Sequence, residues 1–502
     1  MLRAYFNRWR RVFVAKHHVL LLLFLCCVAQ VGYGQEYAIW TPSFGRTAVG
    51  LLLGSGGVEN PSNAATVSDQ TFALMRSDRL ELLSLGLVGT DSYLELKFPV
   101  SRSAGATTFV KISKPTITGL NLDLAALLGL AGENIVGEVR EGAGNGVNQR
   151  GVKIEVDVET KLIVDKNDNY YLAITPKESV SYNSVSINLQ YPAATFGLGT
   201  IEMNVYHAFT LDESVCNQSS VFTNFGEADG VNLTLLSELV ANPHHAISDN
   251  PNEYSSFSSG VLNVGVASSI RQAFYFDHLA STNDGVRAKL GFSKGLLELG
   301  LGNLNSINFK AYNGVTETPV WSGNLEGISN LLGLTLSDII IIGADNRGEL
   351  ELVFRPGVSF DRIEIEFNAG LLGLGVLDDA LRVYNISLAP STPEISEAGQ
   401  PDDVDICEGE TASFQVTATV PQGTLSYQWQ VWDGTSWQSV VGETSSILNI
   451  PNVPLEFDGN QYRVQITGGN IECPQTIYSD VGKLNVSISP GKPHLTISDV
   501  IN

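Results

Sequence analysis

The 502-residue chain is poor in the residues that build metal and redox centres, with five cysteines, three methionines and seven histidines. The cysteines beyond residue 34 are Cys216, Cys407 and Cys473, and their spacing fits no zinc site. The sequence also contains no GxSxG, HExxH or P-loop phrase. These absences argue against an enzyme, so we expect no catalytic residue and no obligatory cofactor, calcium being the one compatible ion.

Basic residues are also scarce, since 30 lysines and arginines face 53 acids and the net charge is −23. Residues 1–34 hold five bases and no acid, followed by the short apolar run "VLLLLFLCCVAQV" and small residues. This pattern is typical of a signal peptide cleaved before Gln35, which leaves a net charge of −28. So acidic a surface repels phosphates, which excludes nucleic acid as a partner.

Long apolar runs are missing beyond the predicted signal peptide, so we expect no membrane span. Export through the signal peptide then predicts a secreted or cell-surface protein. The 49 glycines, together with abundant valine, isoleucine, threonine and serine, favour strands and turns over helices.

The chain repeats itself. "VENPSNAATVSDQTFALMRSD", from Val58, is matched by "VANPHHAISDNPNEYSSFSSG", from Val240. Five further blocks follow in the same order, among them "SYLELKFP" with "RQAFYFDH" and "VSYNSVSINL" with "VSFDRIEIEF". Each copy covers ~175 residues, which suits a domain rather than a solenoid repeat.

Apolar residues alternate within each copy, as in "SVSINL" and "RIEIEF", which predicts half-buried antiparallel strands. Two leucine-rich segments, "LNLDLAALLGLAG" and "LEGISNLLGLTLSD", are predicted as short helices or as loops that close one end of a domain. We therefore predict an all-β chain with two tandem antiparallel jelly-roll sandwiches, at residues 35–209 and 210–390.

A proline-rich linker precedes a third pattern at residues 391–488. Trp429 on one strand, and Tyr462 after Asp458 and Gly459, are typical of an immunoglobulin-like β-sandwich with a tyrosine corner. Val464 occupies the position of the usual second core cysteine. We therefore expect Cys407 and Cys473 to form a disulfide near one end of the domain, the alternative being two free thiols. Residues 489–502 read as a linker or the start of a further module of a longer chain.

The phrases "CEGETASF", "YQWQ", "DGNQYRVQITG" and the late Cys473 resemble the immunoglobulin-like modules of large secreted and surface proteins of the Bacteroidetes. The two copies resemble the repeated domains beside such modules, and their opening phrase is similar to galactose-binding, discoidin-like jelly rolls. The resemblance implies a cell-surface or secreted adhesin. Its acidic opening position, which falls near Asp69 in the first copy and at Asp249 in the second, implies a cation or sugar loop.

Few residues qualify as site candidates. Asp69, Asp249 and Asp165 are the candidates for a calcium ligand, Asp165 because "DKNDN" carries oxygen ligands at alternate positions, although a hairpin turn explains it as well. Asn60 and Asn242 precede prolines and start turns through side-chain bonds to the backbone, or else belong to a ligand loop. His244 and His245 are neighbours whose side chains point apart, which favours a solvated loop.

The second copy adds two aromatic candidates, Tyr312 and Trp321, in "FKAYNGVTETPVWSG". Each could stack on a sugar ring or fill a core. Taken together, the sequence predicts a non-catalytic protein whose β domains bind an extracellular glycan or protein. The alternatives are a carbohydrate-binding region of a larger polysaccharide-degrading enzyme and a purely structural surface stalk.

Overall fold

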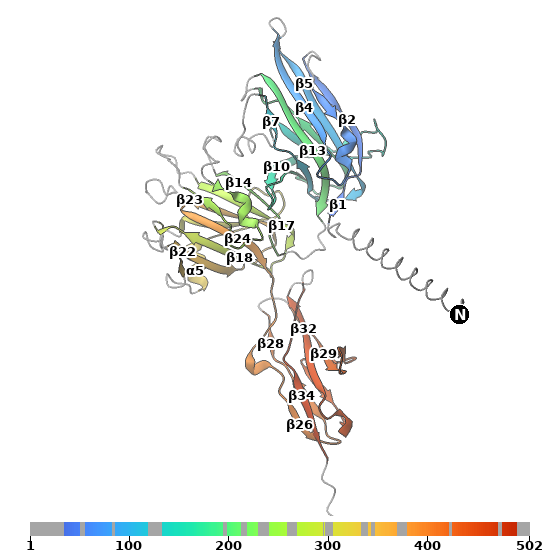
Figure 1. Cartoon of the computed structure of the whole chain (residues 1–502), viewed down its shortest axis with the longest axis vertical. Coiled ribbons are helices and arrows are strands. Elements are labelled where there is room, and N and C mark those ends of the chain that lie inside the picture. Colours follow the sequence, from blue (N-terminus) through green and yellow to red (C-terminus); the bar gives the residue numbers. More distant parts are fainter. Residues whose placement is uncertain are drawn as a thin grey trace, which may run out of the picture.

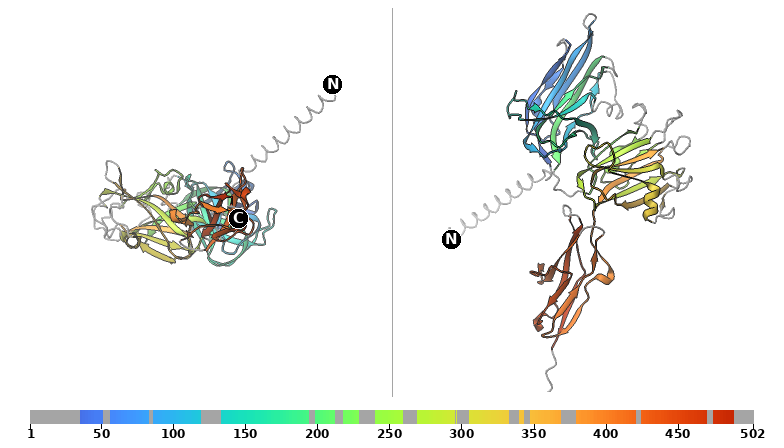
Figure 2. Two further views of the ribbon diagram at one scale, coloured as in Figure 1. Left: turned by 90° about the horizontal axis from the view of Figure 1, so that it is seen from below. Right: turned by 180° about the vertical axis from the view of Figure 1, so that it is seen from behind.

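The computed structural model of the chain describes residues 35–488 apart from short internal segments. These segments are 51–55, 83–85, 119–132, 194–197, 212–217, 229–239, 259–268, 295, 297–304, 333–339, 343–346, 369–378, 421–423 and 470–473. The predicted all-β character is confirmed, because nearly every element is a strand and most sheets are antiparallel. Figures 1 and 2 show three β domains in chain order. No helix in the described ranges is long and apolar enough to cross a membrane.

The first copy consists of two sheets that face each other across one core. The first sheet has the order β2 (Trp40–Val49), β5 (Gly86–Arg102), β12 (Tyr182–Leu189), β8 (Ile135–Glu141), β9 (Val152–Lys153). The second has the order β3 (Gly57–Glu59), β4 (Ala73–Leu82), β13 (Gly199–Leu211), β6 (Thr108–Ile112), β11 (Tyr170–Pro176), β10 (Val158–Val164). Two short strands also pair with β13, namely β1 (Gln35–Tyr37) and β7 (Thr116–Ile117).

The second copy has the same strand order in both of its sheets. Its first sheet runs β14 (Phe222–Ala228), β17 (Ser269–Ala280), β23 (Phe360–Asn368), β19 (Ile307–Tyr312), β20 (Trp321–Asn324). Its second runs β15 (Val240–Ala241), β16 (Ser255–Phe257), β24 (Leu381–Ala389), β18 (Gly285–Phe292), β22 (Arg347–Phe354), β21 (Ile340–Ile342). A helix, α5 (Leu325–Leu332), follows β20 inside one of the predicted leucine-rich segments, and the other segment lies outside the described residues.

The two copies share even an irregularity of pairing. The β6–β13 register shifts between Val205 and His207, and the β18–β24 register shifts opposite Val383, 178 residues after Val205. The offset of 178 residues also applies to the strands β5 and β17, because Leu94 pairs with Ile187 and the residues 178 positions later, Gln272 and Ile365, pair with each other. The sequence match of "SYLELKFP" with "RQAFYFDH" is therefore wrong by one residue. A slip of one residue exchanges the two faces of a strand, so this correction decides which side chains of β17 face outward.

Each copy opens with a short 3-10 helix, η1 (Pro61–Ala65) or η3 (Pro243–Ile247). The preceding residues, Asn60 and Asn242, adopt left-handed φ angles of 50° and 51°. Neither asparagine side chain caps its helix, so the predicted side-chain bond is wrong. Asparagine suits these positions because it tolerates the left-handed region better than other residues with a Cβ.

The third domain packs one larger sheet against shorter strand pairs around Trp429, which is fully buried. The larger sheet contains β26 (Val404–Cys407), β34 (Gly482–Ser487), β32 (Gln461–Gly469), β29 (Thr424–Trp432), β30 (Trp437–Ser439) and β33 (Pro474–Tyr478). The smaller pairs are β27 (Ala412–Gln415) with β31 (Ile447–Ile450) and β25 (Glu394–Ile395) with β28 (Ala418–Thr419), and two 3-10 helices are η7 (Glu397–Gly399) and η8 (Leu455–Phe457). The Nε1 of Trp429 donates to the carbonyl of Ser445 at 2.9 Å, which satisfies the one polar atom of this buried ring.

The strand register argues against the predicted Cys407–Cys473 disulfide. Cys473 and Cys216 lie outside the described residues, and Cys407 is a free thiol. Pro474, which follows Cys473, pairs with Gly469 at one end of β32, whereas Cys407 pairs with Ser487 at the far end of β34. Along β32 and β34 this separation amounts to about 40 Å at ~3.3 Å per residue. A disulfide requires Cα atoms within about 7 Å, which Cys407 and a neighbour of Pro474 cannot meet.

Candidate functional site: the groove between the two copies

The two copies are joined by an aromatic cluster on the outer face of the first copy. Phe222, from β14 of the second copy, lies 4.8 Å from Phe109 on β6 and 5.1 Å from Tyr171 on β11, measured between ring centroids. Val164 of β10 also forms a bridge to Thr223 of β14. Because these contacts are apolar and buried, they fix β14 against the first copy and thereby set the walls of the space between the domains.

The two loops that resemble metal sites in the sequence meet at this domain contact. Lys166, in the β10–β11 turn, is 2.5 Å from Asp249, and the Nδ1 of His244 is 3.7 Å from Asp168. Asp165 accepts hydrogen bonds from the backbone of Asn169 and Asn167, which is the bonding of a hairpin turn. Burial lowers the pKa of His244, although Asp168 opposes this shift. Within the described ranges no group of three His, Cys, Asp or Glu residues could hold a metal ion.

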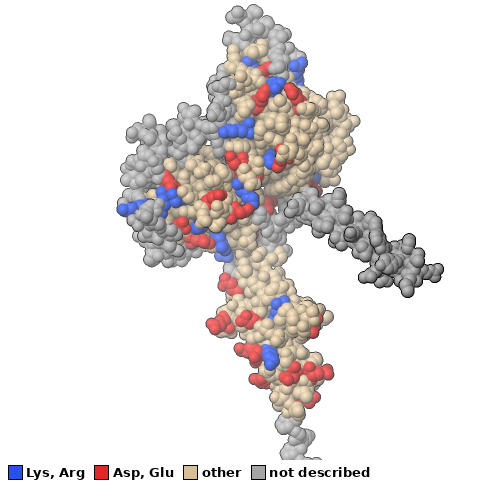
Figure 3. Space-filling view, in the orientation of Figure 1, with Lys and Arg blue, Asp and Glu red and all other residues tan. Residues whose placement is uncertain are grey.

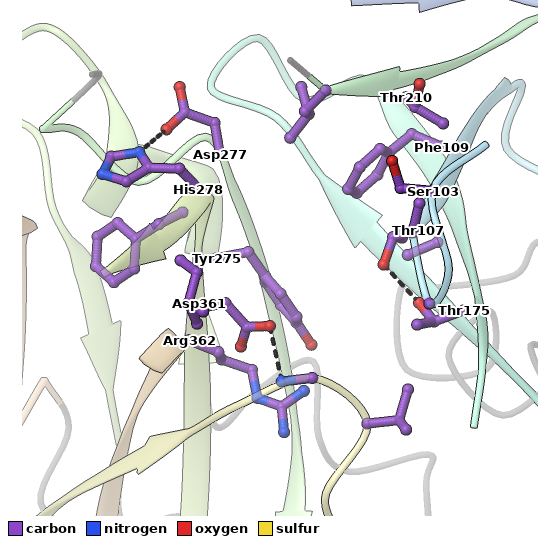
Figure 4. Close-up of a pocket in the computed structure, with 18 of the residues that line it drawn as sticks. Ser103, Thr107, Phe109, Thr175, Thr210, Tyr275, Asp277, His278, Asp361 and Arg362 are labelled. Atoms are coloured by element: carbon purple, nitrogen blue, oxygen red, sulfur yellow. Dashed lines mark hydrogen bonds and ion pairs between the residues drawn. The ribbon is translucent and has the colours of Figure 1, made fainter. Parts of the chain in front are cut away.

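Beside the aromatic cluster lie two adjoining cavities of about 220 and 230 Å³. Both are lined by Glu159, Lys161, Tyr275 and Arg362, so they form one groove between the copies. Figure 4 shows how side chains of the first copy face those of the second across the first cavity. The first-copy wall includes Ser103, Thr107, Phe109, Thr175 and Thr210, and the second-copy wall includes Tyr275, Asp277, His278, Asp361 and Arg362.

Arg362 is the central side chain of the groove and only 6% of it is exposed. Its guanidinium lies 4.5 Å from the ring centroid of Tyr312 and 5.5 Å from that of Tyr275, within cation–π range. Tyr312 donates a hydrogen bond to Glu364 at 3.3 Å. Burial, assisted by Glu364, raises the pKa of Tyr312 to about 12, so its hydroxyl remains a hydrogen-bond donor at neutral pH. These contacts hold the two rings and the guanidinium in a fixed arrangement.

The second cavity balances its charges. Its lining contains three bases and three acids, namely Lys161, Arg271, Arg362, Glu159, Glu317 and Glu364. Lys161 lies 2.9 Å from Glu159, and Arg271 lies 3.9 Å from Glu364. Figure 3 shows a similar mixture over the first two domains, whereas acids predominate on the third. Balanced charges beside aromatic rings offer hydrogen bonds and stacking to an uncharged polar ligand without the desolvation of an unpaired ion.

The first copy does not offer the corresponding face. The outward-facing Glu95 on β5 is fully buried, because Gly151 of the segment 142–151 donates its backbone N–H to the Glu95 Oε1 at 3.0 Å. The guanidinium of Arg150 lies 4.2 Å from the ring centroid of Tyr93 on the same face. The first copy thus covers with its own loop the face that the second copy turns to the groove, so the duplication does not produce two equal sites.

The candidate residues predicted from the sequence lie in different environments in the structure. Tyr312 lies in the groove. Trp321 stacks at 5.4 Å on Phe354 and packs, partly buried, against the core of the second copy. Asn60 and Asn242 start 3-10 helices, and Asp69 pairs with Lys111 at 2.9 Å.

Sequence reasoning missed Arg362 and Tyr275. Both residues occupy outward-facing positions of strands in which core and surface residues alternate. A correct alignment of "RQAFYFDH" with the first copy would have assigned Tyr275 to the outward face and its two neighbours to the core. The bridge between β14, which pairs with β17, and β10 of the first copy has no signal in the sequence.

Comparison with known proteins gave no matching family model and no matching curated protein. Among solved structures, a β-1,2-glucanase from Parabacteroides distasonis is 10% identical over 55% of this chain and 38% of its own, with a TM-score of 0.21. An allantoicase is 12% identical over 70% of this chain and 92% of its own, with a TM-score of 0.20. A chimeric titin Z1Z2 is 20% identical over 20% of this chain and 99% of its own, with a TM-score of 0.15. At such TM-scores these likenesses carry no argument about function.

Proposed function

We propose that this chain is an exported, non-catalytic binding or adhesion protein whose first two domains together hold an extracellular glycan in the groove between them. The observation that carries the proposal is the fixed arrangement of Arg362 between Tyr275 and Tyr312 in the charge-balanced second cavity of the groove. Sugars bring hydroxyl groups that bond to such paired polar side chains and apolar ring faces that stack on tyrosine. The acidic surface supports the same class of ligand over nucleic acid.

The fold behind this proposal is a pair of jelly rolls followed by an immunoglobulin-like module. In each copy the eight main strands alternate between two sheets in an order that supports a jelly roll. In the third domain the buried Trp429 and Tyr462, both near Phe414, support the immunoglobulin-like assignment. The resemblance to Bacteroidetes surface adhesins supports a location of this architecture outside the cell.

The same groove would serve the alternative, a carbohydrate-binding region of a larger polysaccharide-degrading enzyme. The two readings differ in what the longer chain contains and not in how the groove binds, so both predict glycan binding. A structural stalk predicts none.

A glycan array probed with the exported chain, with and without calcium, tests the proposal. The best glycan is then titrated by calorimetry against wild type, Tyr275→Ala and Arg271→Ala. We expect at least about tenfold weaker binding for Tyr275→Ala, since truncating a central aromatic contact commonly costs about 2 kcal/mol or more and tenfold corresponds to about 1.4 kcal/mol. The control is Tyr478→Ala, which removes a tyrosine ring from the surface of the third domain, where Tyr478 is 49% exposed. An empty array, or binding that Tyr275→Ala leaves unchanged, would refute the groove.

A further inference from the structure

The first copy carries a third cavity, of about 250 Å³, on the outer face of its second sheet. It shares no lining residue with the groove. The side chains that form it come from β1, β6, β11, β13 and the loop after η1. The ones that matter for binding are Tyr37, Asp69, Lys111, Tyr171, His207 and Phe209.

His207 places an unsatisfied nitrogen in this cavity. The residue is 7% exposed, and its Nδ1 has no hydrogen-bond partner. The nearest acid oxygen, Oδ1 of Asp69, is 3.8 Å away, which is too far for a hydrogen bond. Nδ1 is therefore the ring nitrogen that is available to a ligand. Buried polar atoms are nearly always paired, so the unpaired Nδ1 indicates a missing partner.

The charges around this nitrogen cancel. Lys111 is 8% exposed and its Nζ lies 2.9 Å from Oδ1 of Asp69, whose side chain is 58% exposed at the mouth of the cavity. Burial lowers the pKa of His207, the nearby Lys111 adds to this shift and Asp69 opposes it, so the ring is neutral at pH 7. An anionic ligand would meet Asp69 and a cationic ligand would meet Lys111. The balance therefore favours an uncharged ligand with several hydroxyl groups.

Aromatic rings form the apolar part of the cavity. The ring of Tyr37 lies 5.5 Å from that of His207 and 5.6 Å from that of Phe209, and Tyr171 packs edge-on against Phe209 at 6.0 Å. Such rings give a flat apolar surface beside the polar cluster. The cavity is smaller than the ~300 Å³ typical for drug-sized ligands, so it suits one ring and not a chain of sugars.

We propose that this cavity is a second binding site, independent of the groove, for a single neutral polyhydroxylated ring such as one hexose unit. One ligand hydroxyl donates to Nδ1 of His207. A neighbouring hydroxyl accepts from Lys111 and donates to Asp69, and an apolar face of the ring lies against Tyr37.

Saturation-transfer NMR followed by calorimetry on the exported chain tests this site. The probes are glucose, galactose, mannose and N-acetylglucosamine as neutral rings and glucuronate as a charged one. Asp69→Asn changes an exposed residue and is not expected to disturb folding, and His207→Gln retains a polar side chain of similar size. We expect both substitutions to weaken the best neutral sugar at least tenfold. Asp249→Asn, another exposed acid, is the matched control and should leave binding unchanged, as should Tyr275→Ala in the groove.

The pH dependence provides a second readout. The charged and titratable groups that face His207 are Asp69 from the loop, Lys111 from β6, Tyr37 from β1 and Tyr171 from β11. Protonation of His207 removes the Nδ1 acceptor, and its pKa is lowered from the ordinary 6.5. The affinity should therefore fall as the pH decreases below about 6.5 in wild type and much less in His207→Gln. The proposal is overturned by binding of glucuronate alone, by no binding within the panel, or by neutral-sugar binding that Asp69→Asn and His207→Gln leave intact.

Discussion

Replacing Phe222 by alanine is expected to loosen the second copy from the first while leaving each domain folded. The ring of Phe222 is almost fully buried, and its partners Phe109 and Tyr171 belong to the other copy. Removing it takes apolar surface out of the contact between the domains and leaves a cavity there. Since Phe→Ala in a core costs about 3–5 kcal/mol, and the edge strand β14 can relax, we expect about 3 kcal/mol at this contact.

Part of this free energy belongs to the stacked pair itself. Phe109 and Phe222 lie 4.8 Å apart with an interplanar angle of 22°, the geometry of a stacked pair. In a double-mutant cycle of Phe109→Ala and Phe222→Ala we expect a coupling of about 1–2 kcal/mol. A control cycle pairs Phe222→Ala with Phe414→Leu in the third domain, whose core is separate, and this cycle should be additive.

Native-state hydrogen exchange followed by mass spectrometry suits this cycle, because it resolves each domain and does not require two-state unfolding of the whole chain. The relevant peptides cover β10 and β14, where Val164 meets Thr223. Lower opening free energies in these peptides alone would support the docked arrangement. Additive effects of the two substitutions, within about 0.3 kcal/mol, would show that the rings do not touch in solution and that the groove has no fixed walls.

Three further outcomes follow from local geometry. Asn242→Ala should destabilise the second copy by about 1–2 kcal/mol in urea unfolding, because Asn242 has a left-handed φ of 51° that alanine adopts only with strain. Asn242→Gly should be tolerated, because glycine adopts this φ freely. Equal effects of the two substitutions would contradict the left-handed conformation. Trp321→Ala should lower the free energy of unfolding by about 3 kcal/mol through loss of the contact with Phe354, and it should leave glycan affinity unchanged. Unchanged stability in thermal unfolding together with weaker glycan binding in calorimetry would show instead that Trp321 binds the ligand. Cys407→Ser should change the stability by less than about 1 kcal/mol, and Cys407 should react with a thiol reagent in the unreduced chain, whereas loss of a disulfide would cost about 2–4 kcal/mol.

The sequence-based predictions that failed depended on contacts in space that the sequence does not show. Tyr312 and Trp321 stand nine residues apart in one aromatic phrase, yet one lies in the groove and the other stacks on the core residue Phe354. The turn around Asp165 and the loop around Asp249 look like separate cation loops, but they contact each other across the domain boundary through Lys166. Cys407 and Cys473 look like a pair because both lie at the borders of strands, and only the register shows how far apart these strand ends are.

The sequence alone determined that the chain is β-structured and internally duplicated, because strand periodicity and repeated phrases are local properties that survive without knowledge of contacts. Tertiary structure decided which face of which copy is available. The same outer face is covered by the segment 142–151 in the first copy and opens to a groove in the second, since Phe222 docks on the partner domain. That difference depends on contacts between residues far apart in the chain, which alternation and composition do not encode.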